Sequence, residues 1–228
     1  MVRADSQSAG RGQFGSRWES EAGKNLTLSV VLYPTWLEVS AQFYLSMAMA
    51  LALHDAVHST RYAVHGQHTP YTVNRVPCTV KWPNDIYLNF HKVAGILIQN
   101  FLSGQHLQAS VVGIGLNVNQ MEFDPALPNP TSLAIALGKK FDLDAVAESL
   151  FGHLERRYLQ LKSGGGPAIK AEYERHLLSS NKPARFVRSV DGSEFAGIIR
   201  GVTESGRLRI ETNAGEETFE VKEVRLII

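Results

Sequence analysis

Three short stretches of the chain combine glycine with charged or amide side chains. The first spans residues 10–15 (Gly-Arg-Gly-Gln-Phe-Gly) and is followed by Arg17. Glycines let backbone N–H groups converge on an anion, and the arginines add fixed positive charge. Because no Gly-Lys-Ser/Thr follows and no strand–turn–helix surrounds it, the stretch is neither a P-loop nor a dinucleotide-binding motif. It is either an anion-binding loop or a flexible surface loop.

The second stretch consists of two nearby segments that together contain two lysines and an aspartate. Residues 81–85 read Lys-Trp-Pro-Asn-Asp, and residues 92–97 read Lys-Val-Ala-Gly-Ile-Leu. A hairpin would bring Lys81, Lys92 and Asp85 to one end of a sheet. A lysine held there can bridge a carboxylate and a phosphate as a point charge. The alternative is that both lysines are solvated residues flanking strands.

The third stretch spans residues 113–119 (Gly-Ile-Gly-Leu-Asn-Val-Asn). Glycine at alternate positions removes side chains from one face of a strand, so a flat ligand could approach closely. The asparagine amides could then bind its polar edges. The alternative is a bulged strand in the core.

Other chemistry has weaker support. His54 and His58 lie one helical turn apart, but no third metal ligand is evident, so core or surface histidines are favoured. Cys78 lies in an apolar stretch and is expected to be inert. No nucleophilic serine motif is present.

Hydrophobic patterning predicts the elements that position these stretches. Residues 5–25 have no periodicity and are predicted to form a long loop, which in a compact domain is usually functional. Strands are predicted at 26–33, 76–82, 93–101 and 107–118, and helices at 40–57, 131–137, 143–161 and from the glycines at 164–166 to about 179.

The pattern changes at Pro183. Short alternating segments separated by turn residues predict about five strands and a small antiparallel barrel. A unit of this size has little core of its own and should lean on the main domain. We therefore predict a domain over residues 1–180 and a second one over 183–228.

Composition restricts the class of protein. The 228 residues are 44% hydrophobic and 20% charged, with a net charge of +1, which is typical of a globular protein and argues against one that coats nucleic acid or anionic membrane. The longest apolar stretch, residues 43–53, is shorter than the ~20 residues of a membrane span. A single cysteine and the absence of a signal peptide predict a cytoplasmic protein.

Taken together, these motifs resemble those of the biotin protein ligase family. The resemblance is strong over about residues 3–140 and weaker over the terminal barrel. It implies an α+β fold: a mixed or antiparallel sheet with packed helices, as in class II synthetases, plus a C-terminal SH3-like barrel. The matching stretches are 4–7 (Ala-Asp-Ser-Gln), 10–12, 17–18 (Arg-Trp), 23–26 (Gly-Lys-Asn-Leu), 81–85, 92–97 and 113–119.

The resemblance also implies an activity. Biotin and ATP would form biotinyl-5′-adenylate, and the acyl group would pass to a lysine of a biotin carboxyl carrier protein. The substrates would be biotin and ATP, with Mg²⁺ carried by ATP and no metal held by the protein. Two alternatives stay open: a catalytically impaired chain that only binds biotin, the adenylate or the carrier domain, and a ligase for lipoate. The 81–85 and 92–97 stretches count against lipoate.

Family positions imply a role for each matching residue. The catalytic residues would be Lys92, Arg11 and Asp85. Those that bind biotin would be Gln7, Arg11, Gly12, Gln13, Lys92, Gly95, Ile96 and Leu97. Those that bind the nucleotide would be Arg11, Trp18, Asn84, Lys92, Gly113 and Asn117.

Two departures from the family pattern add expectations. Gln13 stands where many members have a basic residue, which removes one positive charge over the adenylate. The family's Ser/Thr-Thr-Asn segment and helix-turn-helix domain have no counterpart, so we expect a shortened N-terminus and no repressor function or DNA binding. An edge strand exposed in this way would invite pairing between two copies, so a homodimer is a further expectation.

Overall fold

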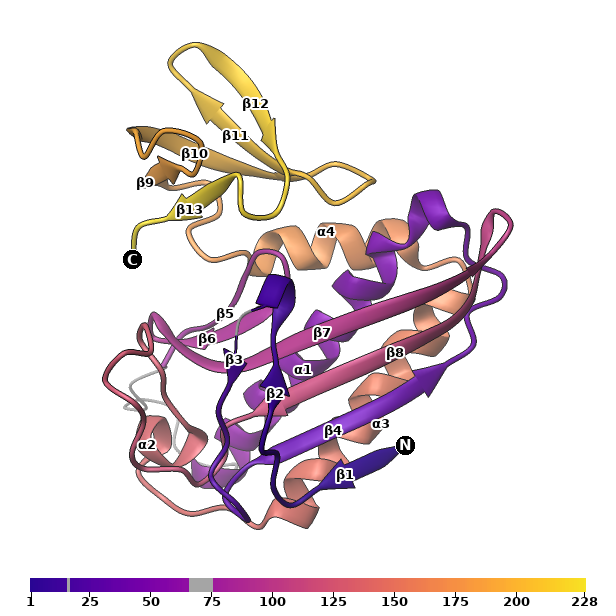
Figure 1. The fold of residues 1–228 in the computed structure, drawn as a ribbon, viewed down its shortest axis with the longest axis vertical. Coiled ribbons are helices and arrows are strands. Elements are labelled where there is room, and N and C mark those ends of the chain that lie inside the picture. The colour runs from indigo at the N-terminus through magenta and orange to yellow at the C-terminus, as the bar shows by residue number, and fades with distance from the viewer. Residues whose placement is uncertain (16, 66–75) are drawn as a thin grey trace.

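The main element of the fold is a six-stranded sheet in which every pairing is antiparallel (Figure 1). The computed structural model describes residues 1–15, 17–65 and 76–228. In the order of the sheet, the strands are β1 (Val2–Ala4), β4 (Leu26–Leu32), β8 (His106–Leu116), β7 (His91–Ser103), β6 (Asp85–Leu88) and β5 (Cys78–Lys81). The α+β fold predicted from the sequence is confirmed.

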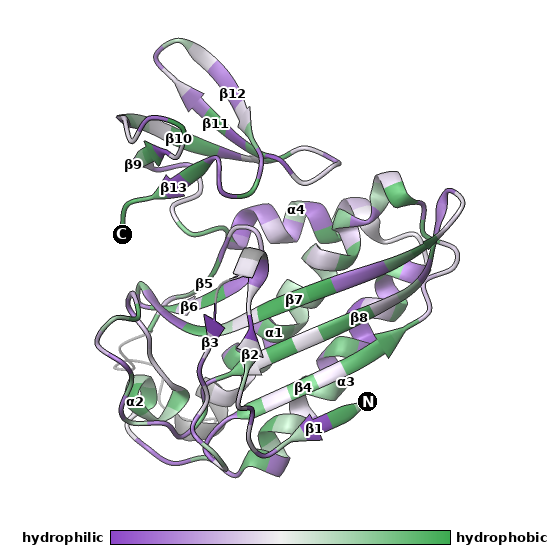
Figure 2. Ribbon diagram, in the orientation of Figure 1, coloured by the Kyte–Doolittle hydropathy of each residue, from purple (hydrophilic) through white to green (hydrophobic). Residues whose placement is uncertain are grey.

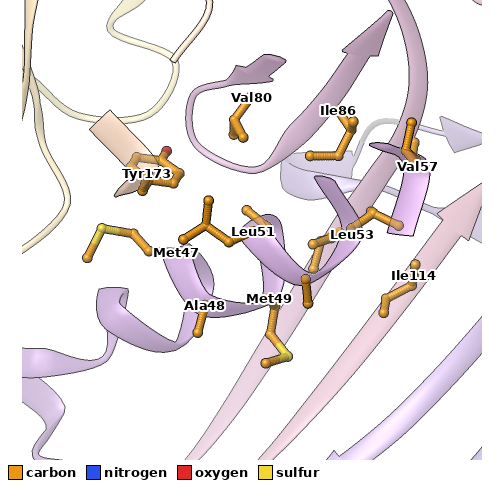
Figure 3. Close-up of a cluster of buried hydrophobic side chains, with 14 of the residues drawn as sticks. Met47, Ala48, Met49, Leu51, Leu53, Val57, Val80, Ile86, Ile114 and Tyr173 are labelled. Carbon is orange, nitrogen blue, oxygen red and sulfur yellow. The ribbon is translucent and has the colours of Figure 1, made fainter. Parts of the chain in front are cut away.

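Helices bury one face of this sheet. Helix α1 (Phe43–His65) lies against β5, β6 and β7, and α3 (Leu143–Lys162) and α4 (Gly166–His176) pack on α1. Because α1 is covered on several sides, it is apolar nearly all round, with Met47 and Leu51 near Val80 and Met49 on another side (Figure 3). The short helix α2 (Leu133–Leu137) follows the end of β8.

The other face of the sheet carries a small hairpin (Figure 1). It consists of β2 (Gly10–Arg11), a 3-10 turn (Gln13–Gly15) and β3 (Arg17–Trp18). The prediction of a loop without strands over residues 5–25 is therefore wrong in this detail. Gly10 explains the pairing, because a Cβ there would lie 2.2 Å from the backbone oxygen of Trp18. Below, residues 10–15 and 17–18 are called the glycine hairpin.

The C-terminal segment forms a second antiparallel sheet, as predicted. The Phe195 ring stacks on Phe186 and on Phe219, which joins β9, β10 and β12. The domain boundaries given above stay a prediction. In the order of the sheet, the strands are β12 (Gly215–Phe219), β11 (Leu208–Thr212), β10 (Glu194–Val202), β9 (Pro183–Arg188) and β13 (Val224–Leu226).

The hydropathy of the residues differs between the strands of the large sheet and the more exposed elements. Strands β4, β7 and β8 carry mainly hydrophobic residues, whereas α4 and β12 carry many hydrophilic ones (Figure 2). Among the residues that the structure describes, no helix is both long and apolar enough to span a bilayer.

His54 is buried in α1, with both ring nitrogens facing acceptors. Its Nδ1 lies 3.4 Å from Asp55 Oδ1, and its Nε2 lies 3.3 Å from the Cys78 carbonyl oxygen. Burial disfavours the imidazolium, but the contacts with Asp55 and Cys78 outweigh it and raise the pKa of His54 from 6.5 to about 9. The histidine is therefore a core residue that holds a proton at neutral pH.

This raised pKa predicts a stability that depends on pH. Because the folded-state pKa is about 9 against 6.5, the contribution of His54 is complete below about pH 6.5 and is lost as the pH rises through about 9. Urea unfolding of the wild type and His54→Gln would measure it. We expect the difference in unfolding free energy to shrink by about 3 kcal/mol between about pH 6 and about pH 9.5. A difference independent of pH would contradict the assignment.

Candidate functional site

A cavity of about 480 Å³ lies on the open face of the large sheet, beneath the glycine hairpin. Its walls come from four parts of the chain that are far apart in sequence: the hairpin with the residues before it, β4, the β6–β7 pair and β8. Val221 and Lys222 of the C-terminal segment complete it. The three glycine-containing stretches identified in the sequence therefore meet at one place.

Lys92 and Asp85 form an ion pair in this cavity. The Nζ of Lys92 lies 2.6 Å from Asp85 Oδ2, and about 30% of each side chain is exposed. A β-bulge aims the lysine. Ile86 pairs with Ala94 but Tyr87 pairs with Lys92, so one extra residue on β7 turns Lys92 to the same face as Asp85.

Gly95 makes room for this pair. A Cβ on Gly95 would lie 3.0 Å from Asp85 Oδ1 and 3.3 Å from Lys92 Nζ, so a larger residue would crowd both groups. Next to Gly95 along the cavity wall are Ile96 and Leu97 of β7. The hairpin of β6 and β7 thus presents an ammonium group held by a carboxylate above an uncrowded strand.

Trp18 of the glycine hairpin lies over β8. A Cβ on Gly115 would lie 2.3 Å from Cε2 of the indole, so the missing side chain is what admits the ring. The Nζ of Lys92 lies 5.7 Å from the centre of the Trp18 ring, within cation–π range. Trp18 therefore connects the hairpin to the lysine and to the glycine-containing strand.

The cavity lining carries an excess of positive charge. Arg11, Arg17, Lys92 and Lys222 line it, and Asp85 is the only carboxylate among the described lining residues. Positive groups that converge in a concave site favour anionic ligands, since they lower the cost of bringing negative oxygens together. The site can therefore hold phosphate and carboxylate groups at once.

Most of the residues predicted for the site line the cavity. Asn84 and Asn117 do not; both are almost fully buried. Asn84 Nδ2 lies 3.5 Å from Ser46 Oγ, and Asn117 Nδ2 donates to the Thr131 carbonyl at 3.0 Å. Those that line the cavity are Gln7, Arg11, Gly12, Gln13, Trp18, Asp85, Lys92, Gly95, Ile96, Leu97 and Gly113.

Sequence reasoning missed several polar residues of the lining. Thr27 and Ser29 of β4 and Gln99 of β7 line the cavity, as does Lys222 beyond β12. The alternation Leu-Thr-Leu-Ser at 26–29 is a signal for the first two, because it places both hydroxyl groups on one face. Lys222 carries no comparable signal, since its position depends on how the C-terminal sheet lies against the main one.

Lys81 lies on a second cavity, of about 450 Å³, between the β5–β6 turn and the C-terminal sheet. Its Nζ donates to the Tyr87 hydroxyl at 3.4 Å. Burial, with repulsion from Lys92 and Arg225, outweighs attraction to Asp85 and lowers the pKa of Lys81. Of the two lysines in the predicted hairpin, only Lys92 lines the first cavity.

Comparisons with known proteins give a consistent result. The family model for the biotin/lipoate A/B protein ligase family matches residues 1–117. The chain is 31% identical to the biotin–[acetyl-CoA-carboxylase] ligase of Paracoccus denitrificans, over 98% of this chain and 88% of the relative. It is 30% identical to the bifunctional ligase/repressor BirA of Bacillus subtilis, over 94% of this chain but 62% of the relative.

A solved structure extends the likeness to three dimensions. The biotin protein ligase from Aquifex aeolicus in complex with biotin and ATP matches with a TM-score of 0.76 and 26% identity. The match covers 99% of this chain and 87% of that one. The alignment therefore includes the large sheet, the glycine hairpin and the C-terminal sheet.

Proposed function

Because the chain belongs to the biotin/lipoate A/B protein ligase family, we propose that it attaches biotin to a lysine of a biotin carrier domain at the expense of ATP. The observation that carries this proposal is the Lys92–Asp85 pair, held at 2.6 Å on the wall of a cationic cavity beneath the glycine hairpin. The names of the relatives support biotin as the acid and a carboxylase as the partner.

The first step joins two anions. A carboxylate oxygen of biotin attacks the α-phosphorus of ATP, the bond from that phosphorus to the β-phosphate oxygen breaks, and pyrophosphate leaves. Lys92 and Arg11 neutralise the oxygens as they approach. Preorganised donors of this kind are usually the largest catalytic contribution, each accounting for about 3–4 kcal/mol of the barrier.

Asp85 holds Lys92 in place for this step. Since Asp85 Oδ2 accepts a hydrogen bond from Nζ, the ammonium group is already oriented before substrates bind. We assign the biotin side of the cavity to Gln7, Gly12, Gln13 and residues 95–97. On the nucleotide side we place Trp18, Gly113, Asn84 and Asn117, of which the two asparagines do not line the cavity itself.

The second step transfers the acyl group. The uncharged amine of a carrier lysine attacks the acyl carbon of the adenylate, the bond from that carbon to the phosphate oxygen breaks, AMP leaves, and the nitrogen loses a proton to form an amide. The adenylate is a mixed anhydride that water would hydrolyse. Residues of the glycine hairpin line the cavity, and the hairpin would therefore protect the adenylate from water.

Mg²⁺ would enter with the triphosphate. Among the described residues no group of three or more histidine, cysteine or acidic side chains could hold a metal ion, and the one carboxylate of the cavity lining is engaged by Lys92. Mg²⁺ keeps several waters and binds mainly through substrate phosphates. We therefore propose that the ATP phosphates would carry Mg²⁺ and that it would neutralise the leaving pyrophosphate.

One incubation tests the proposal. The chain is mixed with ATP, Mg²⁺, labelled biotin and a biotin carrier domain, and both pyrophosphate release and labelling of the carrier are followed. We expect both, in equal amounts. Biotin binding without pyrophosphate release would replace the proposal with a binding role, and release with lipoate in place of biotin would replace the substrate.

Two further expectations accompany the proposal. We place the protein in the cytoplasm, on the ground of its single cysteine. We also propose a homodimer formed through the edge strand β1, whose Val2 is 67% exposed. Sedimentation of the wild type and of Val2→Lys would test the second: a monomer in both would contradict it.

A further inference from the structure

The turn that precedes Asp85 (residues 82–84) is held from two sides by parts of the chain outside the cavity. We propose that Trp82 is a positioning residue through which the C-terminal sheet and α4 fix the Lys92–Asp85 pair. The inference rests on the proposed function, because it concerns the same reaction. Trp82 does not line the first cavity, and it would influence the rate only through the position of Asp85.

The first contact joins the turn to the C-terminal sheet. The indole Nε1 of Trp82 donates to the backbone oxygen of Gly206 at 2.9 Å. Gly206 lies between β10 and β11 with φ +94, and a Cβ there would lie 2.3 Å from the Phe43 ring. The Gly206 carbonyl is therefore fixed by a glycine-dependent turn that packs on α1.

The second contact joins the turn to α4. The hydroxyl of Tyr173, a fully buried residue, donates to the Pro83 carbonyl oxygen at 2.7 Å. The adjacent Glu174 accepts a hydrogen bond from the Val202 backbone N–H at 2.9 Å, at the end of β10. Helix α4 thus bonds the turn through one residue and the C-terminal sheet through the next.

The turn transmits these restraints to the site over a short distance. Residues 82–84 connect β5 to β6, and Asp85 follows at once, paired in register with Lys81. Asp85, whose carboxylate binds Lys92, follows only two residues after Pro83, whose carbonyl is held by Tyr173. A displacement of about 1 Å at a reacting group can cost about a hundredfold in rate, so small shifts of this turn matter.

The test uses the full chain and Trp82→Phe, which keeps an aromatic ring but loses the N–H donor. If Trp82 positions Asp85, kcat for adenylate formation falls about tenfold, while KM for biotin changes less than about twofold. Trp36→Phe is the matched control, because Trp36 is also half-buried and packs against Tyr158 of α3, away from the turn. It should leave kcat unchanged.

A double-mutant cycle separates positioning from general loosening. In an Asp85→Asn background, Trp82→Phe should have little further effect on kcat, since the group through which it acts is already changed. Tyr173→Phe removes the hydrogen bond to the Pro83 carbonyl, so it should lower kcat alone and have little further effect in the Asp85→Asn background. It replaces Trp82→Phe in the test if that variant does not fold. Normal kcat in both variants, or effects that multiply with that of Asp85→Asn, would overturn the inference. Absence of pyrophosphate release from the wild type would instead reject the proposed function.

Discussion

Lys92→Ala is expected to lower the rate of adenylate formation by at least about a hundredfold, with the fold intact. The lysine is the group that the bulge in β7 turns toward the cavity and that Asp85 orients. Its loss leaves two anions to meet without the central positive charge. The partner carboxylate stays about 30% exposed, so water can solvate it and the fold survives. Pyrophosphate release and thermal unfolding, measured on one preparation, check both parts.

Lys162→Ala is the control for this variant, because it removes a lysine from the last turn of α3. It should release pyrophosphate at the wild-type rate. Near-normal adenylate formation by Lys92→Ala would remove the lysine from its assigned role. A large loss of thermal stability would show that the ion pair serves the fold instead.

Gly115→Ala is expected to displace the Trp18 ring from its position against β8 and to reduce the rate of adenylate formation about a hundredfold. The added Cβ would lie 2.3–2.6 Å from three atoms of the indole, and no real Cβ contact is that short. The ring must therefore leave β8 and carry the glycine hairpin, with Arg11, away from Lys92. Quenching of tryptophan fluorescence by acrylamide should increase at the same time.

Gly113→Ala is the matched control for folding, since it lies two residues earlier on the same strand and face. Its added Cβ would meet Leu97 at 3.5 Å, an ordinary contact, so its unfolding midpoint should stay close to that of the wild type. If Gly115→Ala left quenching and adenylate formation unchanged, Trp18 would not be held by this strand.

The sequence predicts most of the elements because their signals are local. The alternation in β4, β7 and β8 and the nearly uniform apolarity of α1 follow from burial on one face or on all sides. Strand β6 was missed because Asp85–Leu88 is short and follows a proline turn. The strands of the glycine hairpin were missed because each has two residues and they are defined by pairing, not by composition.

The site is predicted less completely, for reasons of geometry. The direction of the Lys92 side chain depends on a β-bulge, and no residue type in the sequence indicates that bulge. Asn84 and Asn117 belong to motifs shared with the family, but neither lines the cavity. Asn84 contacts Ser46 and accepts a hydrogen bond from the lining residue Gln13 at 3.4 Å, and Asn117 donates to the Thr131 carbonyl. Lys222 reaches the cavity only because of how the two sheets lie against each other.

The most direct test is a crystal structure of the chain with a non-hydrolysable analogue of biotinyl-5′-adenylate. We expect the group that replaces the phosphate within hydrogen-bond distance of Lys92 Nζ, between the glycine hairpin and β7. The analogue bound elsewhere, or bound with Lys92 Nζ beyond hydrogen-bond distance of that group, would contradict the central claim.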